Sequence, residues 1–378
     1  MRIIVLLIFV IFLAFPITAN ATEPENPSEV QQELFDKFDF SEIDEMLADM
    51  FPEEKLGLSD LISGLISGEM EFSFALIKKL VIDQFTYELQ NSRSGLIHIL
   101  LLVIVSAIFA NFSSVFKSSQ VAEISFSMLY MLLITICLNN FRVLVDAAAT
   151  NLSQLLEFME VLGPIYFLAV AMATGSSTSV TFYQLILLLI LLVEMIVLNF
   201  LIPFTQIYLI IRILSEFSPE IHLNKFAEFI EMVVSWSLKT LLAAIMGVNL
   251  IQGLLTPVID SVKRSFLVKG GEALPVIGDA IGGATEIVLG TAVLIKNGIG
   301  VAGMIVCLII SLVPMIQMAI TALLYQMIAA LIQPISDKRM VNCVSSMADG
   351  VKLLLKIVVT SSVLFMITLA VVATTTGG

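Results

Sequence analysis

Residues 275–303 read PVIGDAIGGATEIVLGTAVLIKNGIGVAG, and this stretch combines two opposed properties. It is apolar enough to enter a lipid bilayer, yet it contains seven glycines, two carboxylates and one lysine. Glycine lets neighbouring helix backbones approach closely in a membrane, and an intramembrane charge persists only where protein or water compensates it. The stretch therefore predicts membrane helices packed around a polar or mobile feature.

The composition of the whole chain is that of a membrane protein. Its 378 residues are 58% hydrophobic and 13% charged, with a mean hydropathy of +1.01. Soluble domains are typically about 45–50% apolar and about 25% charged. We therefore expect an all-α, polytopic membrane protein. The three cysteines lie in or beside apolar runs without a C-x-x-C motif, so we expect them to be small buried hydrophobes.

The amino terminus has the pattern of a secretory signal peptide over residues 1–21. Met1-Arg2 precedes an apolar run over residues 3–15, and Ala19-Asn20-Ala21 forms a small-residue cleavage site. An uncleaved first membrane helix is the other interpretation. The short apolar run favours cleavage, which would place the mature amino terminus outside the membrane that translocates it.

An acidic segment follows over residues 22–93. Residues 22–92 contain 17 Asp and Glu but only four Lys, which accounts for the net charge of −13 of the whole chain. Apolar residues recur in it at helical spacing, so we expect a small exported helical segment. It would either pack as a cap on itself and on the membrane domain or dock a basic partner. Its acidity argues against binding nucleic acid or anionic lipid.

The remaining residues, 94–378, predict a multispan membrane domain with about seven or eight transmembrane or re-entrant helices, because a crossing needs roughly 20 residues. Arg142–Glu160 and Asn224–Thr240 are amphipathic, so we expect interfacial helices at about 142–160 and 224–240. The candidate spans are 95–112, 124–140, 158–174, 182–204, 238–258, 276–295, 299–332 and 352–373.

Basic residues give an expectation for the topology. The positive-inside rule places Lys263, Arg264 and Lys269 in the cytoplasm together with Lys338 and Arg339. The two groups share a side only if the chain crosses the membrane an even number of times between them. Treating 276–295 and 299–332 as two separate crossings meets that condition.

Glu194 is the first candidate functional residue, because it lies midway along an apolar span. A charged residue there costs roughly 2.5–3.5 kcal/mol on insertion scales. It would serve an ion or proton site or line a pore. Alternatively, a protonated or hydrogen-bonded Glu194 would join helices, with Gln184 or Asn199 as its partner.

A second group of candidates lies within 275–303. Gly278, Gly282, Glu286 and Gly290 recur every four residues, so they fall close to one helical face and predict a close-packing seam. Lys296 is ten residues beyond Glu286, about 15 Å along a helix, which excludes a direct pair within one helix. Each charge must find its partner on another helix, at the membrane interface or across a subunit boundary.

Gly298-Ile-Gly300-Val-Ala-Gly303 matches the residue pattern of the dinucleotide-binding motif but lacks the structural context that this motif requires. That motif needs a preceding buried strand and an acidic residue about 20 positions on, and neither is present. The sequence also lacks a P-loop and an H-E-x-x-H motif. We therefore expect no cofactor, no metal site and no enzymatic activity.

An ordered series of residues carries a resemblance to a known family. The chain resembles stage III sporulation protein AE over essentially its whole length, although no single piece of the series is specific. The series is Trp236-Ser-Leu-Lys-Thr, Gln252-Gly253, Pro257, Asp260, Lys263-Arg264, Pro275-Val-Ile-Gly278 and Leu294-Ile-Lys-Asn-Gly-Ile-Gly300.

The resemblance implies a multi-pass subunit of the mother-cell channel complex, joined to the forespore through stage II sporulation protein Q. Other stage III proteins of that complex include an ATPase and ring-forming subunits that resemble secretion-system parts. The family brings no established catalytic residues. We therefore expect a bilayer-embedded conduit subunit that is able to form homo-oligomers, whose amino terminus faces the intermembrane space and which binds no nucleic acid. The alternatives are a self-sufficient secondary transporter and an assembly scaffold without its own pore.

Overall fold

The computed structural model consists of long helices, and its described residues contain no strand. It describes residues 37–50, 57–67, 81–87, 119–174, 176–217, 223–271 and 278–375, and a few single positions before residue 109. The expected all-α fold is confirmed for these residues. The long helices are α6 (Ser119–Thr174), α7 (Ser176–Val193), a π-helical segment (Glu194–Leu201), α8 (Ile202–Phe217), α9 (Asn224–Gly271), α10 (Gly278–Ile332) and α11 (Lys338–Thr375).

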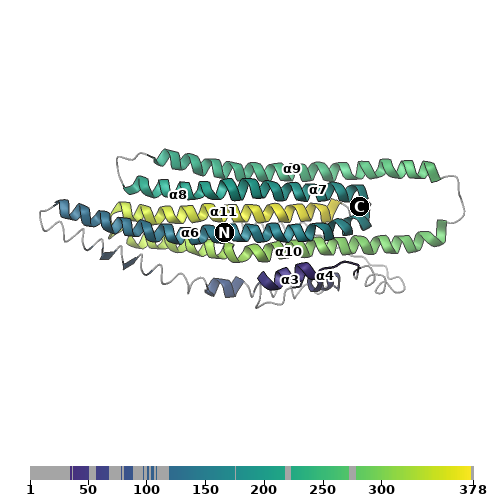
Figure 1. Ribbon diagram of the computed structural model, residues 1–378, viewed down its shortest axis with the longest axis horizontal. Helices are drawn as coiled ribbons and strands as arrows, with labels where there is room; N and C mark the ends of the chain where they lie inside the picture. Colours follow the sequence, from purple (N-terminus) through teal and green to yellow (C-terminus); the bar gives the residue numbers. More distant parts are fainter. Residues whose placement is uncertain are drawn as a thin grey trace. The chain divides into compact units, whose positions relative to one another are not determined.

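Contacts between side chains fix the directions of the central helices. In α6, Asn140 donates to the hydroxyl of Tyr325 at 2.9 Å, and Asn151 donates to the carbonyl of Ile310 at 2.8 Å. Residue numbers rise along α6 as they fall along α10, so these two helices run antiparallel. Figure 1 shows them side by side with α11.

The core of the bundle is the pair α10 and α11, which α6, α7 and α8 cover. Apolar side chains of all these helices are buried there. Several buried polar groups are hydrogen-bonded across or within helices; the hydroxyl of Ser362, for example, donates to that of Ser311 at 2.6 Å. Helix α9 is more peripheral, and it contacts α8 and α11 through a narrow apolar stripe.

Five helices are long and apolar enough to cross a membrane among the described residues, fewer than the seven or eight expected. The signal peptide and most of the first expected span, 95–112, lie outside those residues. Elsewhere, neighbouring expected elements are parts of single helices. Residues 124–140, 142–160 and 158–174 all belong to α6, 224–240 and 238–258 to α9, and 276–295 and 299–332 to α10.

The expected breaks are absent because the polar residues at those positions lie on one helical face, which leaves the backbone ladder uninterrupted. Pro164 and Pro314, which are residues of a type that often breaks helices, lie inside α6 and α10. A proline in a helix removes one hydrogen bond, and surrounding helices compensate for it in membrane proteins.

The continuity of α10 also bears on the expected topology. Lys263, Arg264 and Lys269 lie near the end of α9, shortly before α10 begins, whereas Lys338 and Arg339 follow its end. One helix rather than two crossings separates these basic groups. They therefore lie toward opposite ends of α10, and a single crossing by α10 would place them on opposite sides of a membrane. That they share the cytoplasmic side stays a prediction, and it would need α10 to enter and leave the membrane on the same side.

Two short helices form part of the acidic segment: α3 (Ser41–Met50) and α4 (Leu58–Ser67). The carboxylate of Asp44 accepts the backbone N–H of Leu58 at 2.6 Å and the hydroxyl of Ser59 at 2.9 Å, so α3 caps the start of α4. Before α3, hydrogen bonds from Ser41 lower the pKa of Asp39. Helix α3 also contacts α6, and α4 packs on α10.

Candidate functional site

A continuous polar face runs along the middle of α6, on the side that the other described helices leave exposed. It begins with an exposed ion pair between Arg142 and Asp146, whose charged atoms are 4.0 Å apart. It covers the 19 residues from Arg142 to Glu160, whose ends are about 27 Å apart at a rise of 1.5 Å per residue. We call it the α6 polar face, and its residues are Arg142, Asp146, Thr150, Ser153, Glu157 and Glu160.

The opposite side of the same stretch of α6 is apolar and buried. These side chains are at most 7% exposed: Leu144, Val145, Ala148, Leu152, Leu155, Leu156 and Met159. The amphipathic pattern therefore turns the α6 polar face away from the bundle. The length of this face is close to the roughly 30 Å thickness of a bilayer's hydrocarbon core. A polar face of that length within a membrane would require water or protein against it.

Glu194 begins the π-helical segment and points away from the bundle as an exposed residue. Its neighbours on this outer surface are apolar, and Leu191 and Met195 are each more than half exposed. Asn199, an expected partner, donates to the backbone carbonyl of Glu194 at 3.1 Å rather than to its carboxylate. Gln184, the other expected partner, is also exposed.

The π-helical segment has a local cause in the sequence. The N–H of Ile202 donates to the carbonyl of Val197, five residues earlier, and the next residue is Pro203. A proline ring clashes with the carbonyl four residues before it, and a wider turn relieves the clash. The prolines within α6 and α10 are accommodated without such a segment. Because π turns are frequent at functional sites, the local backbone geometry is a second reason to regard Glu194 as a candidate functional residue.

Lys296 lies inside the bundle and is fully buried. Its ammonium group donates to the carbonyl of Ala373 in α11 at 3.4 Å. The acceptor therefore lies on another helix, one of the three places considered from the sequence. Burial on this scale means that Lys296 does not face an open path within one protomer.

Gly298, Gly300 and Gly303, the glycines of the rejected dinucleotide-binding motif, pack closely against neighbouring helices. A Cβ atom on Gly300 would lie 2.5 Å from the hydroxyl of Tyr166, and one on Gly303 would lie 2.9 Å from Leu162. A Cβ on Gly298 would lie 3.2 Å from Ile62 of α4. These three glycines therefore let α6 and α4 approach α10. The sequence predicted close helix packing for the seven glycines of 275–303 together, but it placed the packing seam at Gly278, Gly282 and Gly290 and considered the closely packed glycines individually only as a nucleotide motif.

The expected seam of glycines every four residues is only partly described. Gly278, Gly282 and Glu286 belong to α10, but their side-chain surroundings lie outside the described residues. Gly290 is exposed, and a Cβ atom there would meet nothing within 4 Å. At Gly290, therefore, no other described part of the chain packs closely.

A set of polar contacts that α11 makes with α9 and α10 was not predicted from the sequence. Lys356 donates to the hydroxyl of Ser235 at 2.9 Å, which joins α11 to α9. One turn earlier on α11, Lys352 pairs with Asp349 at 2.9 Å and donates to Gln326 of α10 at 3.3 Å. The spacing of three and four residues between the charges of α11 was the available signal.

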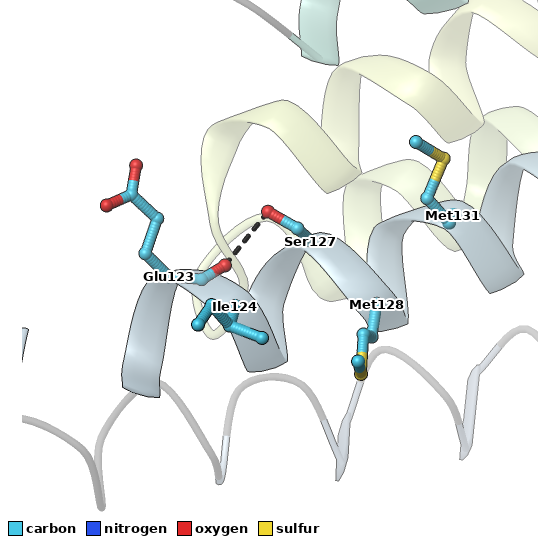
Figure 2. Close-up of a pocket in the computed structure, with 5 residues that line it drawn as sticks. All are labelled: Glu123, Ile124, Ser127, Met128 and Met131. Atoms are coloured by element: carbon cyan, nitrogen blue, oxygen red, sulfur yellow. Dashed lines mark hydrogen bonds between the residues drawn. The ribbon is translucent and has the colours of Figure 1, made fainter. Parts of the chain in front are cut away.

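The described residues offer little that would hold a small ligand. One surface hollow lies along a short stretch of α6, lined by Glu123, Ile124, Ser127, Met128 and Met131 (Figure 2). The hydroxyl of Ser127 donates to the backbone carbonyl of Glu123 at 2.9 Å, so its proton is already used. Over the same described part of the chain, no three His, Cys, Asp or Glu side chains group as metal ligands.

Comparison with known proteins gives a consistent picture. The family model for stage III sporulation protein AE matches residues 56–376. The chain is 24% identical over 364 residues to stage III sporulation protein AE of Bacillus subtilis (strain 168), covering 94% of this chain and 91% of that protein. No solved structure matches it.

Proposed function

Because this chain belongs to the stage III sporulation protein AE family, we propose that it is a membrane-embedded subunit of the channel complex between mother cell and forespore. In this proposal the protein lines the conduit rather than catalysing a reaction. The name of its Bacillus relative supports a role in sporulation, and the five apolar helices support a multi-pass membrane protein.

The α6 polar face is the observation on which the proposed conduit role rests. It offers charged and hydroxyl side chains over about 27 Å, whereas exposed positions on α7 are largely leucine. The leucine-rich surface of α7 is suited to contact with lipid. The α6 polar face is not, because charges that face lipid are costly. The α6 polar face would therefore turn toward water, and residues of neighbouring subunits would complete the wall.

The orientation that we propose places α4 outside the cytoplasm. Helix α4 packs on α10 at Gly298, about 40 residues before Lys338 and Arg339. With those two basic residues in the cytoplasm, the acidic segment would face the intermembrane space. Lys263, Arg264 and Lys269 would then also lie on the outer side, as exceptions to the positive-inside rule.

The proposed partners follow from the family. They are the other stage III proteins of the complex, including an ATPase and ring-forming subunits, and indirectly stage II sporulation protein Q. The chain contains no P-loop, so any nucleotide-driven work would belong to the ATPase. The acidic segment with α3 and α4 would be the contact surface on the outer side.

Cysteine labelling in sporulating cells tests the conduit. The native cysteines, Cys137, Cys307 and Cys343, are all buried, so background labelling should be low. We expect Ser153→Cys to react with a charged, water-soluble thiol reagent and the reaction to reduce late forespore gene expression. Leu188→Cys on α7 is the matched control, because it is exposed but surrounded by apolar residues.

Two outcomes would contradict the conduit. If Ser153→Cys is protected from the charged reagent as fully as Leu188→Cys, the α6 polar face does not meet water. If the cysteine reacts but passage into the forespore is unchanged, the face is wetted without lining the path, as in a scaffold.

A self-sufficient carrier is the second candidate, and Glu194 in a π-helical segment favours it. A proton-coupled carrier should accumulate substrate as the purified protein in liposomes and should lose this uptake on Glu194→Gln. A conduit subunit should accumulate no substrate in liposomes without its partners.

A further inference from the structure

Two opposite charges lie unpaired on the outer surface of the bundle. Glu194 is exposed on the π-helical segment, and Lys239 is exposed on α9. Neither side chain forms a hydrogen bond or ion pair with another residue of the described ranges. Lys239 instead lies close enough to Lys356 for the two positive charges to repel.

Both charges are surrounded by exposed apolar side chains. Leu187, Leu188, Leu191 and Met195 surround Glu194, whereas Trp236, which is 69% exposed, lies one turn before Lys239. Such surfaces suit lipid or protein, but a lone charge within them does not suit lipid. Each charge therefore needs a compensating group, and the described residues of the same chain do not provide one.

The two charges also lie at nearly the same height along the bundle axis, as their alignment with residues of α11 indicates. Gly350 of α11 meets Leu209 of α8, where a Cβ atom on the glycine would lie 3.1 Å away. Asn342 lies eight residues before Gly350 on α11. It donates a hydrogen bond to Glu216, which lies seven residues after Leu209 on α8. Helices α8 and α11 thus run antiparallel, and Glu194 is about level with Phe365.

Lys239 is placed by the hydrogen bond between Lys356 and Ser235. Helices α9 and α11 run parallel, because α8 turns back into α9 and is antiparallel to α11. Lys239 is thus about level with Thr360. The offset from Glu194 is about five residues, roughly 7.5 Å at 1.5 Å per residue. A flexible lysine stem and a glutamate side chain together bridge such an offset.

We propose that Glu194 of one copy of this chain pairs with Lys239 of the next copy, so that the α7 surface of one protomer packs against the α9 surface of its neighbour. Copies that stand side by side in a membrane share the same depth, which brings the two charges together. The apolar side chains around them exclude water and lipid from the pair. Because the two surfaces differ, the contact is head-to-tail, and such a contact closes into a ring or continues as an open chain.

The proposed partner is a second copy of this chain, because the chain itself has the complementary charge at nearly the same height along the bundle. A two-fold contact through either surface alone would instead set Glu194 against Glu194 or Lys239 against Lys239. The inference concerns assembly and stands even if the assembled protein is a scaffold without a pore.

Disulfide cross-linking between two differently tagged full-length copies tests the contact. Glu194→Cys in one copy and Lys239→Cys in the other are co-expressed in sporulating cells, and the membranes are then oxidised. We expect a cross-linked dimer that carries both tags, and much less product when both copies have the same substitution. The matched control pairs Glu194→Cys with Leu323→Cys, since Leu323 is 66% exposed on α10 and outside both surfaces.

A charge exchange provides a second readout that does not depend on cysteine. Glu194→Lys or Lys239→Glu alone should reduce the oligomer seen after mild detergent extraction, and the double variant should restore it. Cross-links only to another protein, or equal yields for the same-site and mixed pairs, would overturn the proposal. Failure of this test would leave the labelling result at Ser153 unchanged, so the two proposals can fail separately.

Discussion

The hydroxyl group of Tyr166 lies 2.5 Å from where a Cβ atom on Gly300 would be, so α6 and α10 touch at a point that has no room for a methyl group. Both residues are fully buried or nearly so, and the ring of Tyr166 therefore cannot swing into solvent. The absence of a side chain at position 300 thus sets the distance between two long helices.

Gly300→Ala should destabilise the folded protein by about 1–3 kcal/mol, the usual cost of overpacking a core. Gly290→Ala is the matched control in the same helix, because a Cβ there would meet nothing within 4 Å. Alanine favours a helix over glycine by about 0.8–1.0 kcal/mol, so the control should be neutral or stabilising. Thermal unfolding in detergent measures both. Equal effects of the two substitutions would show that the contact with Tyr166 does not set the helix spacing.

Lys296 should tolerate replacement by methionine and not by glutamate. Lys296→Met keeps a long side chain in the buried site and removes its charge, which is often close to neutral for a buried ion. Lys296→Glu would set a carboxylate against the carbonyl of Ala373 and should cost about 3 kcal/mol or more. Unfolding in detergent and the yield of folded protein measure the difference. If Lys296→Met unfolds the protein as readily as Lys296→Glu, the ammonium group itself is required for folding.

These glycines and the lysine also mark how far sequence reasoning could go. The helical class follows from composition and periodicity, and the exclusion of a Glu286–Lys296 pair follows from helix geometry alone. The choice between Gly290 and Gly300 as packing positions depends on which helix face meets a neighbour. A single sequence records no such orientation, because both faces of α10 are apolar.

Among the described residues, the number of membrane-spanning helices was overestimated for a related reason. Hydropathy falls at Arg142–Glu160 and at Asn224–Thr240, which predicted interfacial helices between shorter spans. The backbone continues through both regions within α6 and α9. A drop in hydropathy reports a polar face and does not report a break in hydrogen bonding, since the polar residues recur at helical spacing.

Asp44→Ala should loosen α4. Its carboxylate accepts hydrogen bonds from Leu58 and Ser59 at the start of that helix, and loss of such a cap typically costs about 1 kcal/mol. Hydrogen exchange should become faster over residues 58–67 and stay unchanged in α11. Asp49→Ala is the control, because Asp49 is exposed near the end of α3. Unchanged exchange in α4 would mean that its packing on α10, and not the cap, holds it.

Glu194→Gln should weaken self-assembly while leaving the protomer as stable as before. Glutamine keeps the shape and hydrogen-bonding capacity of glutamate but removes the charge that would meet Lys239 of a neighbouring copy. Within the described residues the carboxylate of Glu194 has no partner, so its loss breaks no contact inside one chain. Asn199 binds only the backbone carbonyl of Glu194, and this bond survives the substitution. The oligomer mass in lipid nanodiscs should fall toward that of the monomer, while the unfolding temperature in detergent stays constant. A lower unfolding temperature with an unchanged oligomer would instead assign Glu194 to packing within the protomer.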